Sequence, residues 1–309
     1  MTSASNTMSE QPAAQGAAPA VLPWRRLFYW SVRRELWENR AIYLAPLVMG
    51  GVALIGVMLS TLALPRVLRA VARGDAKHTE ALMGAHSFVA VAIMITGLFV
   101  ALFYCLSALH SERRDRSILF WKSLPVSDLM TVLSKAAIPI AVTPVVTFAL
   151  IVAAQVVIYI WSTIVTVLSG NSPTLYWSHV HLGLMWTALP YGLVVNALWQ
   201  APIYAWFLLV SAWARRVPIL WAMGVAVVPA VIERGAFSSA HIAHFLSERF
   251  FGGFGEAFSI GGKGEKPIHE FSQIDPLRTF SSPELWGGLI VAAAFLAAAV
   301  WLRHRREPI

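Results

Sequence analysis

Long apolar runs separated by short polar segments are the main pattern along this chain. A helix of about 20 apolar residues is long enough to cross a lipid bilayer. We therefore expect an all-α polytopic membrane protein with six transmembrane helices. The predicted spans are residues 41–64, 86–109, 136–168, 183–212, 217–232 and 285–302.

The third and fourth runs are longer than a straight crossing requires, and each contains two prolines. These are Pro139 and Pro144 in the third run and Pro190 and Pro202 in the fourth. Proline lacks a backbone donor and clashes with the preceding turn, so it kinks a helix. We expect kinked helices that project beyond the bilayer.

Composition and charge agree with a membrane protein. Charged residues make up 13% of the chain, about half of the roughly 25% found in soluble domains. The net charge of +8 would suggest nucleic acid as the partner of a soluble protein. With a cytoplasmic N-terminus, however, 15 of the 24 Lys and Arg residues lie on the cytoplasmic side, as the positive-inside rule requires. We therefore predict that both termini are cytoplasmic and that no nucleic acid is bound.

Residues 1–21 are small, polar and rich in Ala and Pro. They lack a basic start followed by an apolar core, so we predict no cleaved signal peptide. We interpret them as a disordered cytoplasmic tail, with the first span as an uncleaved insertion signal. The single cysteine, Cys105, excludes an intrachain disulfide.

The segment 24–40, WRRLFYWSVRRELWENR, has the pattern of a helix lying in the membrane interface. Its arginines recur every seven residues with tryptophans at their border, and apolar residues fall on the opposite side. Glu35 and Glu38 interrupt this pattern. An ordinary basic segment flanking the first span is the alternative. The predicted interface residues are Arg26, Trp30, Arg33, Trp37 and Arg40.

The segment 111–128, SERRDRSILFWKSLPVSD, is the only sizeable cytoplasmic loop. Ser111 can cap a short helix that ends at Pro125, and Ser127 or Asp128 can cap the helix leading into the third span. Aromatic residues and arginine dominate the hot spots of protein interfaces, so we interpret this helix as a docking element. Phe120 and Trp121 could instead belong to an aromatic belt. The candidate docking residues are Glu112, Arg113, Arg114, Arg116, Phe120, Trp121 and Leu124.

Three amides lie within the spans, namely Gln155 in the third and Asn196 and Gln200 in the fourth. Polar groups at that depth face other helices or a cavity. They therefore either form hydrogen bonds between helices or line a transport path.

Together, the interfacial helix, six spans, charged loop and long outer segment resemble the membrane subunit of ABC-2 type transporters, from residue 22 to residue 309. The most specific match is 111–128, which is similar to that family's "E+++…SL…LP(V/I)s" signature. The resemblance implies that 24–40 is the connecting (elbow) helix and that 111–128 contains the coupling helix, which docks on a separate ATPase. It also implies that 233–283 is the outer re-entrant hairpin.

The resemblance further implies a permease subunit in the bacterial inner membrane, surrounded by lipids and paired with a second permease subunit as a homo- or heterodimer. ATP and Mg would bind the partner ATPase, and the direction of transport would be export. This chain itself shows no P-loop, since GGKGEK at 261–266 lacks the required spacing. We predict no catalytic residue, no cofactor and no enzyme activity in it.

Two other classes of function remain as alternatives. A stand-alone channel or secondary transporter usually has ionisable residues deep in its spans, and the predicted spans are nearly free of them. A non-transporting scaffold would share the docking helix but would need no amides in its spans. His241, His244 and Glu248 could bind a metal together with His179 or His181 if they shared a helical face. Isolated histidines near a membrane are common, however, and no metal site is predicted.

Overall fold

The regular structure of the described residues is entirely helical. The computed structural model describes residues 23–115, 126–180, 182–257 and 276–305. Six stretches are long and apolar enough to cross a membrane, which gives the chain the architecture of a multi-pass helical membrane protein, as its apolar pattern predicts. They are Ala41–Val71, Gly84–Arg114, Asp128–Leu168, Pro173–Trp199, Pro218–Phe237 and Pro283–Arg305.

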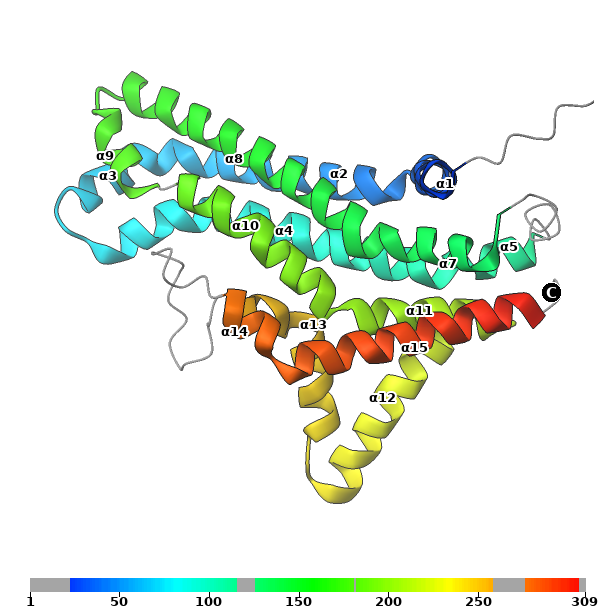
Figure 1. The fold of residues 1–309 in the computed structure, drawn as a ribbon. Helices are drawn as coiled ribbons and strands as arrows, with labels where there is room; N and C mark the ends of the chain where they lie inside the picture. Colours follow the sequence, from blue (N-terminus) through cyan, green and yellow to red (C-terminus); the bar gives the residue numbers. More distant parts are fainter. Residues whose placement is uncertain (1–22, 116–125, 181, 258–275, 306–309) are drawn as a thin grey trace, which may run out of the picture.

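The long helices form two groups that meet along α4 (Figure 1). In the first group α2 (Ala41–Ser60), α4 (Ala76–Ala108) and α8 (Thr143–Leu168) lie side by side. In the second group α11 (Ala201–Trp213) packs along α15 (Pro283–Arg305) and also contacts α4. Buried apolar side chains fill the junction, among them Ile42, Cys105, Ile138 and Leu208.

The third crossing is one continuous helical stretch of 41 residues. It consists of α7 (Asp128–Ala137), a π-helical turn labelled η2 (Ile138–Val142) and α8. The wide turn contains Pro139, whose nitrogen cannot donate the regular helical hydrogen bond. At 1.5 Å per residue the stretch is about 60 Å long, roughly twice the hydrocarbon thickness of a bilayer. The stretch is therefore longer than one crossing requires, and its projection beyond the bilayer stays a prediction.

This crossing begins earlier than the predicted residue 136 because Ser127 caps it. The Ser127 Oγ accepts a hydrogen bond from the Met130 backbone nitrogen at 3.2 Å. This contact confirms the predicted cap. The apolar run alone could not locate the start, because the first turns of α7 contain polar and charged residues.

The predicted fourth span, 183–212, is not a single helix, and only its first part belongs to the membrane-long stretch Pro173–Trp199. It breaks at Gln200 into α10 (Leu182–Trp199) and α11. Pro202 lies in the first turn of α11, where a missing N–H costs no hydrogen bond. Pro190, by contrast, remains inside α10 without ending it. Only one of the two prolines thus marks the break.

The fifth crossing, α12 (Pro218–Phe237), has 20 residues and little buried surface. After it the chain turns back into α13 (His241–Ala257), which packs against α10. Figure 1 shows α12 and α13 as a V projecting from the bundle. The short α14 (Pro276–Ser281) then precedes α15. The predicted outer segment 233–283 is therefore partly helical.

The contact between α13 and α10 is close at Gly253. A Cβ at this position would lie 2.9 Å from the Cα of Asn196 and 2.6 Å from its side-chain oxygen. Two hydrogen bonds flank the contact: Trp199 Nε1 donates to the Glu248 carbonyl at 2.9 Å, and Gln200 Nε2 donates to the Phe250 carbonyl at 2.7 Å. The helix α13 thus reaches the break between α10 and α11.

The shorter helices lie at the two ends of the bundle. One end, called the charged end below, carries α1 (Trp24–Glu38), α5 (His110–Arg114), α7 and the last turns of α15. In Figure 1, α1 is viewed along its axis and therefore lies across the long helices. This geometry confirms the predicted helix in 24–40. The opposite end carries η1 (Thr61–Ala63), α3 (Leu64–Val71) and α9 (Pro173–His179).

Candidate functional site

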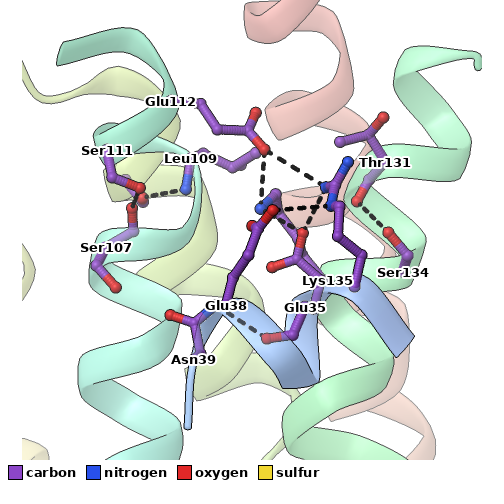
Figure 2. A network of polar contacts seen from close by, with 12 residues as sticks. Glu35, Glu38, Asn39, Ser107, Leu109, Ser111, Glu112, Thr131, Ser134 and Lys135 are labelled. Carbon is purple, nitrogen blue, oxygen red and sulfur yellow. Dashed lines mark hydrogen bonds and ion pairs between the residues drawn. The ribbon is translucent and has the colours of Figure 1, made fainter. Parts of the chain in front are cut away.

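Six charged side chains at the charged end join four helices through ion pairs. Figure 2 labels Glu35, Glu112 and Lys135 at the centre of this cluster. We call this cluster the charge network. Three of these six members are acidic and three are basic. They are Arg34 and Glu35 of α1, Glu112 of α5, Asp128 and Lys135 of α7, and Arg303 of α15. A further acid, Glu38, lies 3.5 Å from Arg34, but its side chain is 53% exposed.

Lys135 is the centre of the charge network. Its ammonium nitrogen lies 2.9 Å from Glu35 Oε1 and 3.0 Å from Glu112 Oε1. The side chains of Lys135 and Glu35 are 3% and 1% exposed, respectively. Glu35 also accepts hydrogen bonds from the Tyr104 hydroxyl at 2.8 Å and from Arg34 at 2.7 Å. Both oxygens of this buried carboxylate are therefore satisfied.

Arg303 connects the last helix to the same network. Its guanidinium donates to Glu112 Oε2, and its Nε donates to Asp128 Oδ1 at 3.0 Å. Glu112 precedes the segment 115–127 and Asp128 follows it. The two helices that flank the charged loop are therefore held together through one arginine of α15.

The charge of Glu35 is maintained by its partners. Burial by itself raises the pKa of a carboxyl group, but the positive charges of Lys135 and Arg34 outweigh this effect and lower the pKa of Glu35 below its usual value. Glu35 is therefore ionised at neutral pH. A buried ion pair is tolerated only when pairing and hydrogen bonds offset the loss of hydration, and this site meets both conditions.

A second set of polar contacts closes the end of α11. The Arg113 guanidinium donates to the carbonyl of Ala212 at 2.7 Å and to that of Ala214 at 3.4 Å. Ser211 Oγ accepts from the backbone nitrogens of Leu109 at 3.0 Å and His110 at 2.9 Å. A cation at the carboxyl end of a helix also complements the helix dipole. These contacts join α5 to the end of α11.

Replacing Arg113 by methionine should lower the stability of the protein in detergent, whereas Arg114→Met should not. Arg113 is buried and bonded to carbonyls, and a hydrogen bond to a charged group contributes about 1.5–3 kcal/mol. The Arg114 side chain is 68% exposed. Midpoint temperatures of thermal unfolding measured on the two variants test this contrast. Equal midpoints would contradict the role given to Arg113.

The predicted docking residues divide into three groups. Glu112 and Arg113 are buried within the bundle, so little of either side chain is open to a partner, and their docking role stays a prediction. Arg114 is exposed and donates to Asp115 Oδ1 at 3.0 Å. The remaining four lie outside the described residues; they are Arg116, Phe120, Trp121 and Leu124.

The predicted cap at Ser111 is corrected. The helix α5 begins at His110, and the Ser111 hydroxyl donates to the Ser107 carbonyl at 2.8 Å. The backbone N–H groups at the start of α5, those of Leu109 and His110, donate to Ser211 Oγ of α11 instead.

The predicted interface residues lie mainly on the exposed side of α1. The Arg33 guanidinium stacks over the rings of Trp30 and Trp37, with centroid distances of 5.0 and 4.7 Å. Both tryptophans are exposed, as are Arg26 and Arg40. This exposed basic and aromatic surface is of the kind that favours a membrane interface.

Glu35 was missed as a functional residue because it was treated as an interruption of the α1 pattern. Val32 and Leu36 pack against the buried core, and Glu35 lies on the same helical face. An acidic residue on an apolar face was therefore the available signal. It indicates a buried partner, which the sequence alone does not name.

The amides within the spans form contacts between and along helices. Gln155 accepts from Trp186 Nε1 at 2.9 Å, which joins α8 to α10. Gln200 bonds the Phe250 carbonyl and accepts from the Tyr204 hydroxyl at 2.6 Å. Asn196 and Gln200 also line a cavity of about 40 Å³, which has room for a few water molecules. The site is thus closed to a larger substrate in this conformation.

A buried histidine was also missed by sequence reasoning. His86 Nε2 lies 3.0 Å from the Tyr176 hydroxyl, beside a cavity of about 200 Å³ that Ser60 and Ser162 also line.

His244 Nδ1 lies 3.5 Å from Glu248 Oε2. Within the residues that the structure describes, however, no group of three acidic, His or Cys side chains is arranged to hold a metal.

Comparisons with protein families, curated proteins and solved structures gave no match to this chain. The fold therefore defines its class, a multi-pass helical membrane protein.

Proposed function

We propose that the chain is the membrane subunit of an ATP-driven ABC-2 type exporter, with ATP hydrolysis on a separate cytoplasmic subunit. The observation that carries this proposal is the charge network. It clamps the two helices flanking the charged loop to each other, to α1 and to α15.

The network suggests how a push on the loop would reach the membrane. The loop leaves from α5, which follows α4, and returns into α7, which continues into α8. Because Glu112, Lys135 and Arg303 bind these elements together, both ends of the loop would move as one body. In this proposal an ATPase bound to the loop shifts the second, third and sixth crossings together with α1.

The proposal also assigns an orientation. The charged end faces the cytoplasm of a bacterium, with both termini there and α1 lying in the inner leaflet of the inner membrane. The exposed Trp30 and Trp37, with Arg33 stacked over both rings, support this place for α1. On the outer side, α12 and α13 would form the re-entrant hairpin, and the packing of α13 beside α10 supports such an insertion.

The proposal includes pairing of two membrane subunits. An exposed stripe on α15 contains the small residues Ala293 and Ala297 between Trp286 and Trp301. Small residues four apart allow close approach of another helix in a membrane. Since the cavity at Asn196 and Gln200 is small, a path along these amides would have to open during transport.

The test of this proposal is partner binding by the loop. Phe120→Ala with Trp121→Ala should leave the subunit inserted but reduce the recovery of the ATPase in a pull-down from membranes. Buried aromatic anchors commonly contribute about 2 kcal/mol or more, which corresponds to roughly a thirtyfold loss of affinity. Tyr29→Ala with Trp30→Ala, an exposed aromatic pair on α1, is the matched control. Arg114→Ala with Arg116→Ala should have a smaller, salt-dependent effect.

Four results would contradict this proposal or favour another function. An ATPase that stays bound to the Phe120/Trp121 variant would refute the docking role of these residues. Loss of the variant from the membrane with its ATPase still bound would indicate an aromatic belt. A wild-type subunit that binds no ATPase but conducts ions in vesicles would be a channel or secondary transporter, and one that does neither would be a scaffold.

A further inference from the structure

An apolar groove lies between α11, α12, α13 and α15. Its volume is about 520 Å³. Among its lining side chains are Ile203, Trp206, Val227, Phe250 and Phe295. The groove is bounded on one side by α12, which has little buried surface. The groove is therefore accessible to molecules that surround the helix bundle.

One charged residue, Arg249 of α13, belongs to the lining of this groove. Its guanidinium stacks on the Trp199 ring at 4.6 Å and lies 5.8 Å from the Phe245 ring. One of its terminal nitrogens donates to the Glu284 carbonyl at 2.7 Å. The other is shielded from solvent and has no hydrogen-bond partner. A shielded guanidinium nitrogen without an acceptor is costly. This nitrogen lies against Gly288 of α15, so a phosphate that drew the side chain away from Gly288 would remove that cost.

We propose that this groove binds a phospholipid of the surrounding membrane, with an acyl chain along the apolar walls and the phosphate on Arg249. The walls suit a hydrocarbon chain because they offer it almost no polar group. The guanidinium suits a phosphate because its planar donors match the phosphate oxygens. This inference does not depend on the proposed transport function, since it concerns only the lipid that the fold retains.

A second copy of the chain fits the groove less well. A symmetric contact that covered the groove would bury Arg249 of both copies, and the groove lining offers no acidic side chain to pair with either of them. The nearby acidic groups Glu248 and Glu284 act on Arg249 through their charge. In the part of the chain that the structure describes, however, neither forms an ion pair with it, and Glu248 contacts His244 instead.

Native mass spectrometry of the purified full-length protein tests the proposal. The wild type, given equal amounts of phosphatidylglycerol and phosphatidylcholine, should retain mainly phosphatidylglycerol. Arg249→Gln should lower its affinity for phosphatidylglycerol about tenfold, the effect of losing one charge-assisted hydrogen bond. Arg249→Lys should retain part of the preference. Arg234→Gln, which removes an exposed cation of α12, should leave binding unchanged.

A variant that fills the groove distinguishes binding of the acyl chain from binding of the phosphate. Ala226→Phe should displace both lipids, because Ala226 lines the groove. Unchanged preference in Arg249→Gln would overturn the proposal, as would lipid binding that survives Ala226→Phe. Displacement of phosphatidylglycerol by inorganic phosphate alone would indicate an anion site without a lipid. Loss of a lipid-free dimer in Ala226→Phe would show that a second copy occupies the groove.

Discussion

Replacing Lys135 by methionine is expected to destabilise the folded protein strongly. The substitution keeps a similar shape but leaves Glu35 and Glu112 without the cation that lies about 3 Å from each. Removing one partner of a buried ion pair typically costs about 3–5 kcal/mol, because the remaining charge stays buried. The variant should therefore show a lower midpoint of thermal unfolding in detergent and a lower yield from membranes.

A double variant distinguishes loss of charge balance from loss of packing. Glu35→Leu with Lys135→Met removes one acid and one base, so the rest of the charge network is balanced again. It should recover much of the stability lost by Lys135→Met alone, since apolar replacements of a buried pair are often neutral. Arg114→Met, an exposed cation on α5, is the control. A double variant less stable than Lys135→Met would contradict the view that Lys135 is needed to offset the buried charge of Glu35.

Two adjacent glycines of α13 should respond to alanine in opposite ways. At Gly253 the added Cβ would lie 2.9 Å from the backbone of α10, so one of the two helices has to move. Overpacking of this kind typically costs about 1–3 kcal/mol. At Gly252 the nearest atom is 3.6 Å away, and alanine favours a helix over glycine by about 1 kcal/mol. We therefore expect Gly253→Ala to destabilise and Gly252→Ala to be neutral or stabilising.

Thermal unfolding of the two variants, together with limited proteolysis of the α12–α13 region, measures this difference. Faster cleavage after α13 in Gly253→Ala would show that this helix has separated from α10. If both variants unfold like the wild type, the close approach at Asn196 does not determine the position of α13.

The sequence alone determined the number and approximate place of the crossings. This was possible because a bilayer requires about 20 consecutive apolar residues for each helix. Each run meets or nearly meets that length within its own segment of the sequence. The helix in 24–40 and the cap at Ser127 were also predictable, since periodicity and capping involve residues only a few positions apart. The docking role of Phe120 and Trp121, which lie outside the described residues, stays a prediction.

Tertiary structure decided which polar residues are buried and what they bind. Glu35 meets Lys135 across 100 positions of sequence, and Glu112 meets Arg303 across 191. No local pattern distinguishes these four from the exposed charges beside them, and the same holds for buried Arg113 and exposed Arg114. Whether a charge can be buried depends on a partner that only the folded chain brings within reach.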